Sequence, residues 1–216
     1  GNTGIGLAMV CANKGYPCIM TMPDSTSIER RKLMRFLGAK VLLTPASEGT
    51  TAAYELAKKL CDKNKWFYAK QFENKANADI HEQTTAKEIW EDCEGVIDEL
   101  VLGVGTGGTI TGCARFLKKY NPKLRVVAVE PQSSPVLSGG KAGPHQIQGI
   151  GAGFIPNVLD IDLIDEIIQV DDLSAMDIGR RLAKEEGLLS GISSGAAVSA
   201  ALKVGSREEA IGKRII

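Results

Sequence analysis

Short apolar runs alternate with amphipathic stretches along the whole chain. Apolar runs bounded by turn residues are typical of strands in a buried parallel sheet, and apolar positions three and four residues apart are typical of the helices that cover it. The pattern predicts strands at 17–22, 40–44, 67–70, 99–104, 124–129, 164–170 and 188–193. It predicts helices at 4–14, 27–37, 51–63, 77–93, 109–119 and 173–186, and a last helix from Gly195. This order indicates an α/β fold built from parallel βαβ units.

The two ends of the chain differ from those of a complete α/β domain. The first residues, Gly1-Asn2-Thr3-Gly4, form a turn sequence with no strand before it, and 214–216 resembles the beginning of a strand. We therefore expect an internal segment of a longer protein. We place a domain boundary near residue 76, because 72–77 looks like a segment that crosses between two domains.

The charge balance and the cysteines narrow the class of protein. Lys+Arg and Asp+Glu each total 26, so the sequence shows neither a nucleic-acid footprint nor an acidic tail. No apolar run approaches the roughly 20 residues of a membrane helix, and no signal-peptide pattern opens the chain. The five cysteines include no C-x-x-C pair, which indicates reduced and mostly buried side chains in a cytosol-like compartment. A nucleophilic cysteine is not favoured, because only His81 and His145 could supply an imidazole base.

A glycine-rich turn, GVGTGGT at 103–109, lies between the predicted strand 99–104 and a helix. Backbone N–H groups and the helix dipole at such a position favour anions. The four glycines let the backbone approach a bound group closely, and Thr106 and Thr109 add hydroxyl groups. The residues leave three interpretations open: a tight turn without a ligand, a site for one phosphate, or a dinucleotide site. The last is open because the glycines spell G-x-G-x-x-G and Glu130 ends the next strand about 20 residues later.

Two further turns place small polar residues where a helix begins. Asn2 and Thr3 offer an amide and a hydroxyl suited to a carboxylate, and Ser193 and Ser194 end a predicted strand just before a helix of small residues. Both turns have the alternative interpretation of helix capping, which Asn, Thr and Ser commonly provide. Three such turns at equivalent strand ends predict a shared pocket.

The motifs together resemble one known enzyme family over essentially the whole chain. The resemblance is carried by GNTGIGLA, TMPDSTSIERRKL, QFENKAN, GVGTGGTITG, GPHQIQGIGAGFIP and EGLLSGISSGAA. These segments are similar to cysteine synthase (O-acetylserine sulfhydrylase), a fold type II pyridoxal-phosphate enzyme. The resemblance implies two open, mostly parallel sheets flanked by helices, with both ends of the fold missing. It implies a smaller movable domain at 1–76 and a larger cofactor-binding domain at 77–216, and it favours pyridoxal phosphate over a dinucleotide.

The resemblance also implies a role for each matching residue. The cofactor phosphate would be held by Gly105, Thr106, Gly107, Gly108 and Thr109. Asn2 would bind the ring hydroxyl oxygen, and Ser193 would bind the pyridine nitrogen. The amino-acid carboxylate would be bound by Asn2, Thr3 and Gln71, and the loop 148–153 would border the pocket mouth. No metal ligand is implied.

The lysine that forms the Schiff base in this family lies before the GNTG turn. The resemblance therefore assigns no covalent catalytic residue to this chain, and we expect the isolated 216-residue chain to be inactive. The implied activity of the family is that of a transferase in cysteine biosynthesis. It is a β-replacement that converts O-acetyl-L-serine and sulfide into L-cysteine through an aminoacrylate intermediate.

The resemblance further implies a cytoplasmic homodimer and, as a partner, the C-terminal peptide of serine acetyltransferase. Two alternatives stay open. The first is a cystathionine β-synthase-like condensation of serine with a thiol, since that enzyme shares GNTGIGLA and FIP-x-VLD. The second is a non-catalytic binding or sensor protein of the same fold, which the residue at the lysine position would distinguish.

Overall fold

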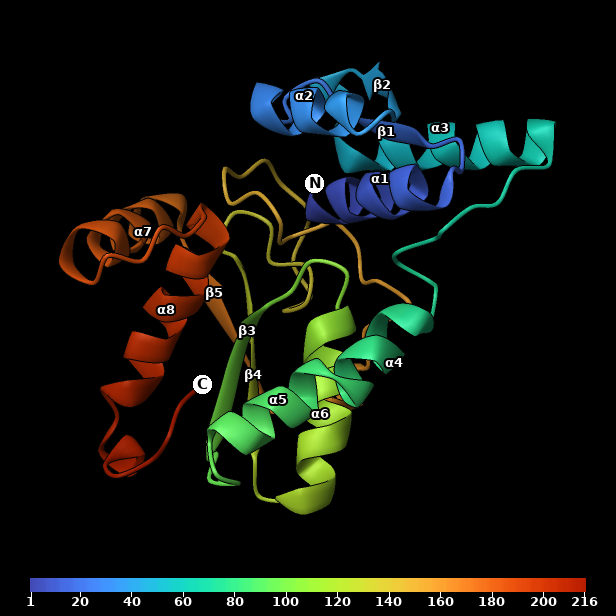
Figure 1. Ribbon diagram of the computed structural model, residues 1–216. Helices are drawn as coiled ribbons and strands as arrows, with labels where there is room; N and C mark the ends of the chain where they lie inside the picture. Colours follow the sequence, from blue (N-terminus) through green and yellow to red (C-terminus); the bar gives the residue numbers. More distant parts are fainter. The chain divides into compact units, whose positions relative to one another are not determined.

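The computed structural model describes all 216 residues and divides into two compact units, Gly1–Lys70 and Gln71–Ile216 (Figure 1). We call them the first unit and the second unit. The division falls between Lys70 and Gln71, whereas the sequence places a boundary near residue 76. The segment after Gln71 belongs to the second unit because the backbone oxygen of Phe72 accepts a hydrogen bond from Val158 N at 3.0 Å. The movable and cofactor-binding roles of the two parts stay predictions.

The first unit contains a two-stranded parallel sheet and three helices. Its elements are α1 (Asn2–Lys14), β1 (Ile19–Pro23), α2 (Ile28–Phe36), β2 (Lys40–Thr44), a 3₁₀ turn (Ala46–Glu48) and α3 (Gly49–Asn64). Strands β1 and β2 pair in register from Ile19 with Lys40 to Pro23 with Thr44. The buried core is formed by Ala8, Met22, Met34 and Ala39. A methyl group on Gly4 would lie 2.9 Å from Met34 Sδ, so a small residue is needed where α1 packs on α2.

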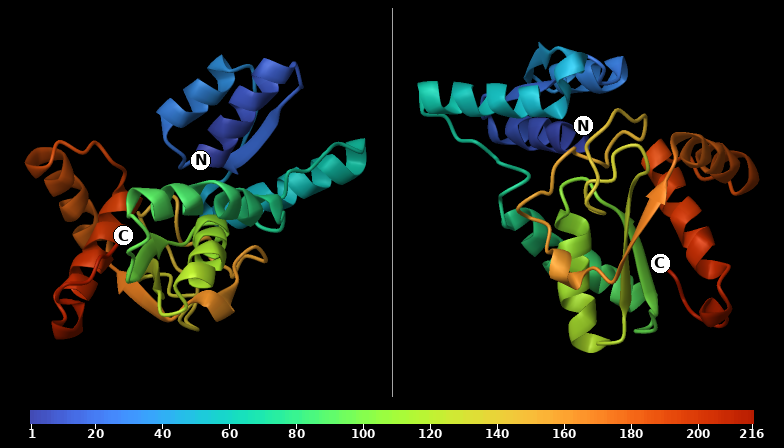
Figure 2. Two further views of the ribbon diagram at one scale, coloured as in Figure 1. Left: turned by 60° about the horizontal axis from the view of Figure 1, so that its bottom comes forward. Right: turned by 180° about the vertical axis from the view of Figure 1, so that it is seen from behind.

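The second unit is built on a three-stranded parallel sheet in the order β3-β4-β5. Its elements are α4 (Ala76–Gln83), α5 (Thr85–Asp92), β3 (Glu99–Gly103), α6 (Gly108–Tyr120), β4 (Arg125–Pro131), a 3₁₀ turn (Ile161–Leu163), β5 (Glu166–Val170), α7 (Asp172–Glu185), α8 (Ile192–Gly205) and a 3₁₀ turn (Glu208–Ala210). The parallel strands and flanking helices confirm the predicted α/β fold. Helices α4, α5 and α6 lie on one side of this sheet, and α7 and α8 lie on the other (Figure 1, Figure 2).

The central strand β4 separates two apolar cores. Val126 and Ala128 belong to the core that contains Leu117 of α6, whereas Val127 belongs to the core that contains Ala200 of α8. Side chains alternate between the two faces of a strand, so a strand covered on both faces is apolar at every position. This is why 124–129 appears in the sequence as an unbroken apolar run.

The predicted helix 77–93 is wrong as one element, because it is broken into α4 and α5 at Thr84. Thr84 has φ −123° and ψ −78°, and its Oγ1 donates to Ile80 O at 2.7 Å. A side-chain hydroxyl that bonds to a nearby backbone carbonyl competes with the continuation of a helix. Residues 81–85 include no glycine or proline, so the sequence carries no strong signal for the break.

The predicted strands at 67–70 and 188–193 are also wrong. A strand needs the backbone of a neighbour to satisfy its N–H and C=O groups, and neither segment pairs with another strand. Lys70 has φ +50°, and the side chain of Leu189 is 94% exposed. The predicted strand start at 214–216 is an isolated parallel bridge between Ile215 and Glu99, at the edge of β3.

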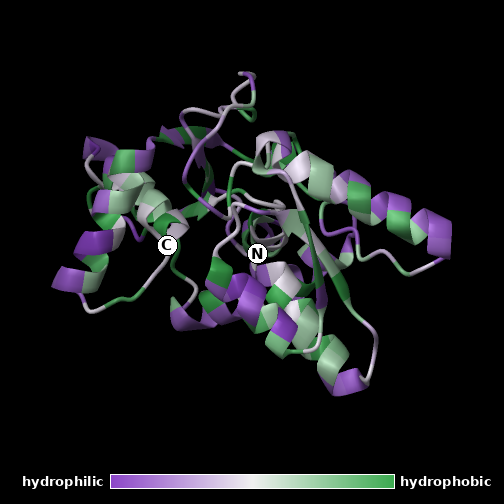
Figure 3. Ribbon diagram, turned by 90° about the horizontal axis from the view of Figure 1, so that it is seen from above, coloured by the Kyte–Doolittle hydropathy of each residue, from purple (hydrophilic) through white to green (hydrophobic).

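None of the helices is both long enough and apolar enough to cross a lipid bilayer. Figure 3 shows the reason along the ribbon, since the longer helices carry hydrophilic as well as hydrophobic residues.

Candidate active site

The glycine-rich turn lies at the carboxyl edge of the sheet, between the end of β3 at Gly103 and the start of α6 at Gly108. Val104 N donates to Val129 O at 3.0 Å, which extends the pairing with β4 by one residue before the chain turns. Gly107 is the N-cap of α6 and has φ +82°, a conformation that favours glycine. The first N–H groups of a helix lack acceptors within the helix, so this turn offers donors to an anion.

Packing within the protein requires the glycines of this turn. A methyl group on Gly105 would lie 2.3 Å from Gly149 O, and one on Gly107 would lie 2.6 Å from Leu159 Cβ. A methyl group on Gly108 would lie 2.1 Å from Asn77 Oδ1. The glycines therefore make room for neighbouring protein atoms, in addition to the close approach of a bound group that the sequence suggested.

Asn77, at the start of α4, connects two residues that the resemblance assigns to ligands. Its Nδ2 donates to Thr106 Oγ1 at 2.9 Å and to Gln71 O at 2.9 Å. Thr106 Oγ1 also accepts from Gly108 N at 3.3 Å. A threonine hydroxyl has two acceptor positions and one proton. Both acceptor positions of Thr106 are therefore used, and its proton is left to donate to a further group.

His81, one turn after Asn77, holds the second threonine of the turn. Its Nε2 lies 3.1 Å from Thr109 Oγ1, and its Nδ1 lies 2.9 Å from Thr85 Oγ1. Burial lowers the pKa of His81, so the imidazole is neutral at neutral pH. With its proton on Nε2, the ring accepts from Thr85 and donates to Thr109, whose own proton is then directed elsewhere.

The sequence interpretation gave no site role to Asn77 or His81. A signal was present, since the two polar residues are four positions apart and share one face of a helix. Their partners could not be recognised from the sequence, because Thr106 and Thr109 are 29 and 28 positions away.

Two of the three predicted turns come together in the second unit. The carbonyl of Gly149 faces Gly105, and a methyl group on Gly149 would lie 3.7 Å from Ser193 Oγ. The loop 148–153 thus lies between the glycine-rich turn and Ser193. Ser193 is in the first turn of α8, after the N-cap Gly191, and does not end a strand as the sequence suggested.

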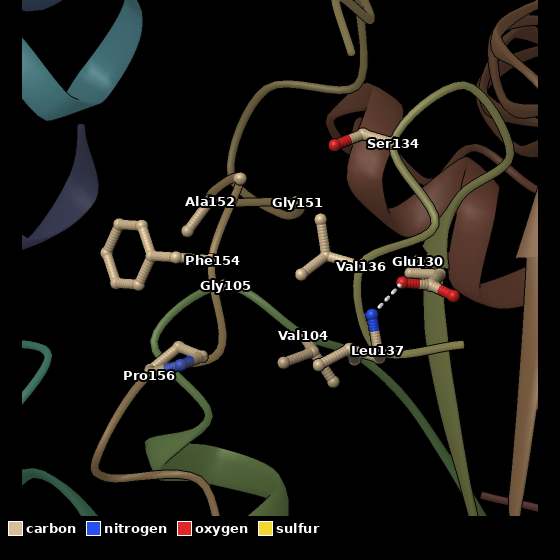
Figure 4. A pocket seen from close by; sticks show the side chains of 11 residues that line it. Val104, Gly105, Glu130, Ser134, Val136, Leu137, Gly151, Ala152, Phe154 and Pro156 are labelled. Atoms are coloured by element: carbon tan, nitrogen blue, oxygen red, sulfur yellow. Dashed lines mark hydrogen bonds between the residues drawn. The ribbon is translucent and has the colours of Figure 1, made fainter. Parts of the chain in front are cut away.

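A small pocket opens beside the turn (Figure 4). Val104 and Gly105 contribute one wall, the loop that contains Gly151 and Phe154 contributes another, and Glu130 lies at the end of β4. The carboxylate of Glu130 accepts hydrogen bonds from the backbone and side chain of the loop that follows it. These donors are Leu137 N at 2.8 Å, Ser138 N at 3.1 Å and Ser138 Oγ at 2.5 Å.

This arrangement bears on the dinucleotide alternative. A dinucleotide site of the G-x-G-x-x-G type uses the acidic residue after the second strand to bind the ribose hydroxyls. Both carboxylate oxygens of Glu130 are already bonded to the protein's own loop, and the side chain is 2% exposed. Glu130 therefore stabilises the loop after β4 and is not available to ribose hydroxyls, which argues against the dinucleotide alternative.

The remaining predicted site residues occupy separate positions. Asn2 and Thr3 are exposed in the first turn of α1, in the first unit. The N-cap of α1 is Gly1, and no side chain makes a capping hydrogen bond, so the capping interpretation of Asn2 and Thr3 is wrong. Gln71 is half-buried at the start of the second unit. No group of three or more His, Cys, Asp or Glu side chains is arranged to hold a metal ion.

Comparison with known proteins places these features in context. The family model described as pyridoxal-phosphate dependent enzyme matches residues 1–216. A cysteine synthase of Staphylococcus aureus is 51% identical over 217 aligned residues, which cover 100% of this chain and 70% of that protein.

Solved structures agree with this similarity. The cysteine synthase from Entamoeba histolytica has a TM-score of 0.94 and 43% identity, and the match covers 100% of this chain and 64% of that one. An O-acetylserine dependent cystathionine beta-synthase from Helicobacter pylori has a TM-score of 0.90 and 40% identity, with 100% and 70% covered. The chain thus spans about two thirds of the length of these relatives.

Proposed function

Because the chain belongs to the pyridoxal-phosphate dependent enzyme family, we propose that it functions in a cysteine synthase that makes L-cysteine from O-acetyl-L-serine and sulfide. The similarity to cysteine synthases over the whole chain supports this activity. The activity, substrates and partners of the whole protein are part of the proposal, since the chain spans only about two thirds of its relatives. The cofactor, when bound, withdraws electrons from the substrate and so assists loss of its β-substituent.

The hydrogen bonding of Thr106 is the observation that carries the proposal. Its Oγ1 accepts from Asn77 Nδ2 and Gly108 N, so its proton is available to a phosphate oxygen. A hydrogen bond to an ionised acceptor is about twice as strong as one between neutral groups. A hydroxyl that is oriented before the ligand binds also loses little freedom on binding. Thr106 therefore fits a dianionic phosphate better than a neutral ligand.

The rest of the turn fits the same anion. Gly105 and Gly107 offer backbone N–H groups near the positive end of α6, whereas Gly108 N already donates to Thr106 Oγ1. Thr109, held by the neutral His81, adds a second hydroxyl without bringing a charge. In the proposal these residues hold the cofactor phosphate and fix the orientation of the ring.

Ser193 is proposed to donate to the pyridine nitrogen. Its position beside Gly149 is consistent with this role, because the carbonyl of Gly149 faces Gly105 of the glycine-rich turn. A neutral hydroxyl does not stabilise a protonated ring nitrogen as a carboxylate would. Ser193 therefore keeps the ring a moderate electron acceptor, which favours loss of acetate over transamination.

Asn2, Thr3 and Gln71 are proposed to bind the substrate carboxylate, and Asn2 also the ring hydroxyl oxygen. Asn2 and Thr3 belong to the first turn of α1, where free N–H groups and the helix dipole favour an anion. The side-chain amide of Gln71 can donate to a carboxylate oxygen. The backbone of Gln71 is held by Asn77, whose Nδ2 donates to Gln71 O at 2.9 Å.

The covalent link to the cofactor is proposed to come from a lysine outside residues 1–216, so that the isolated chain is inactive. We also propose a cytoplasmic homodimer that can bind the C-terminal peptide of serine acetyltransferase. Borohydride reduction of the full-length holoenzyme, followed by peptide mapping, tests the first point. A pyridoxyl-lysine found within residues 1–216 would contradict it.

The activity is tested with the full-length protein, pyridoxal phosphate and two substrate pairs. One pair is O-acetyl-L-serine with sulfide, and the other is L-serine with homocysteine. We expect cysteine from the first pair and little cystathionine from the second. Cystathionine as the main product would favour the cystathionine β-synthase-like alternative. Bound cofactor without turnover of either pair would favour a binding or sensor protein.

A further inference from the structure

The chain turns sharply after β4 and buries a serine in the second unit. Pro131 ends the strand, and Ser134 N donates to Pro131 O at 3.0 Å, so residues 131–134 form a tight turn. A second turn follows at once, because Val136 N donates to Ser134 O at 2.9 Å. Serine is mostly exposed in folded proteins, whereas Ser134 is only 2% exposed.

The buried hydroxyl of Ser134 has no hydrogen-bond partner within the protein. Ser134 lines the small pocket beside the glycine-rich turn, and Figure 4 shows its oxygen on the side of the pocket where Ala152 and Gly151 lie. A hydroxyl can donate one hydrogen bond and accept two, and leaving it unpaired in the interior is costly. A free buried hydroxyl that faces a pocket therefore indicates a ligand in that pocket.

The pocket is small and otherwise mostly apolar. It leaves about 10 Å³ for the centre of a molecule the size of water, which is about the room that one such molecule needs. The second polar side chain in the lining, that of Glu130, already accepts hydrogen bonds at both carboxylate oxygens. The remaining side chains of the lining are apolar: Val104, Val136, Leu137, Ala152, Phe154 and Pro156. Ser134 Oγ is thus the one side-chain atom of the lining that is left to bind a ligand.

This lining favours hydrogen sulfide over water as the occupant. A buried water typically makes about three hydrogen bonds, and the side chains of this pocket offer one free partner. Hydrogen sulfide has a single heavy atom, like water, but an S–H group is a weak donor and sulfur is a weak acceptor. It therefore loses less than water does when it enters an apolar pocket. The hydrosulfide anion is disfavoured, because a charge buried among apolar side chains and beside the Glu130 carboxylate is costly.

We propose that this pocket is the binding site for hydrogen sulfide, with Ser134 Oγ as its hydrogen-bond partner. The inference rests on the proposed function, in which sulfide is the second substrate. Val104 and Gly105 in the lining belong to the turn proposed for the cofactor phosphate, and Gly151 N ties the opposite loop to Val104 O at 3.0 Å. Hydrogen sulfide bound here lies next to the proposed cofactor site. The small size of the pocket excludes thiols with several heavy atoms, such as homocysteine.

The kinetic test uses the full-length holoenzyme with O-acetyl-L-serine and sulfide. Loss of acetate precedes the use of sulfide, so each substrate has its own kcat/KM. Ser134→Ala should lower kcat/KM for sulfide by about threefold to tenfold, because the bound molecule loses a hydrogen bond, and should leave kcat/KM for O-acetyl-L-serine unchanged. Ser133→Ala is the matched control, since Ser133 is exposed and does not line the pocket. It should change neither value.

Two variants of Val136 change the size of the pocket without changing its polarity. Val136→Ile adds one heavy atom to the lining, as many as hydrogen sulfide has, and should lower kcat/KM for sulfide at least as much as Ser134→Ala. Val136→Ala removes two heavy atoms and should raise the use of methanethiol relative to sulfide, measured as formation of S-methylcysteine. Circular dichroism checks that each variant is folded, and Val136→Leu replaces Val136→Ile if that variant is not.

A crystal of the full-length holoenzyme soaked with sodium hydroselenide locates the ligand directly, because selenium gives an anomalous signal. We expect an anomalous peak in contact with Ser134 Oγ. A pocket that holds only water, or equal kcat/KM for sulfide in Ser134→Ala and the wild type, overturns the proposal. If the wild type makes no cysteine from O-acetyl-L-serine and sulfide, the proposed function fails, and the anomalous peak alone decides whether the pocket binds hydrogen sulfide.

Discussion

Replacing Thr106 with valine removes one hydroxyl from the proposed phosphate site and keeps the shape of the side chain. Thr106 Oγ1 accepts from Asn77 and Gly108, so its proton is the one left for a phosphate oxygen. Losing a hydrogen bond to a charged group costs about 1.5–3 kcal/mol. We therefore expect the affinity for pyridoxal phosphate to fall by about one to two decades.

The assay compares two ligands on the apoenzyme of the full-length protein. Titration with pyridoxal phosphate, followed by absorbance, should show the weakened binding in Thr106→Val. Pyridoxal lacks the phosphate, so its dissociation constant should be the same in the variant and in the wild type. Thr106→Ser keeps a hydroxyl and should restore most of the affinity.

Thr111→Val, in the helix that follows the turn, is the matched control. Thr111 is 1% exposed, and its Oγ1 accepts from Asp160 N at 3.0 Å. Loss of this hydroxyl leaves the half-buried N–H of Asp160 without its acceptor, which should lower the free energy of unfolding by about 1 kcal/mol. The affinity for pyridoxal phosphate should stay unchanged. If Thr106→Val binds the cofactor normally, or loses as much affinity for pyridoxal as for pyridoxal phosphate, the assignment of Thr106 is wrong.

Four further predictions test other parts of the account. Gln71→Ala should weaken O-acetylserine binding by about one to two decades while cofactor affinity is kept, since a hydrogen bond to a charged carboxylate is worth about 1.5–3 kcal/mol; an unchanged substrate dissociation constant would contradict this. Ser193→Asp should slow the β-elimination more than Ser193→Ala in a stopped-flow assay, and equal rates would exclude the proposed contact. A hydrogen bond from Arg207 lowers the pKa of Glu166 from its ordinary value of 4.5. The pair therefore stabilises the fold at pH values above 4.5, and this contribution is lost as the pH falls through the lowered pKa. In urea unfolding, the free energy of unfolding of Glu166→Gln should decline less at acid pH than that of the wild type. Lys75 has φ −58°, which proline can adopt, so Lys75→Pro should raise the free energy of unfolding by about 0.4–1 kcal/mol in the same assay.

The sequence predicts those elements whose local pattern and tertiary neighbours agree. Strand β2 has the predicted bounds, 40–44, and β1 lies beside it. The segment 188–193 has an equally apolar pattern but no neighbouring strand, and it is irregular up to the start of α8. Whether an apolar run becomes a strand depends on its partner, which local sequence does not encode.

The candidate site could likewise be predicted only in part from the sequence. The sequence predicts the glycine-rich turn and its preference for an anion, because both depend on its place between a strand and a helix. The sequence does not show why the turn needs its glycines, because the residues that pack against them come from distant segments: Gly149, Leu159 and Asn77. The orientation of Thr106 also depends on Asn77, 29 positions away. A pattern within one segment predicts where a ligand binds, but the groups that orient the ligand residues come from the tertiary fold.

We have proposed that the turn between β3 and α6 holds the cofactor phosphate. A crystal structure of the full-length holoenzyme would show where the phosphate binds. We expect the phosphorus atom to lie at the N-terminus of α6, with phosphate oxygens within hydrogen-bonding distance of Thr106 Oγ1, Thr109 Oγ1 and the backbone N–H group of Gly107. A phosphate bound elsewhere, with Thr106 still bonded only to Asn77 and Gly108, would contradict it.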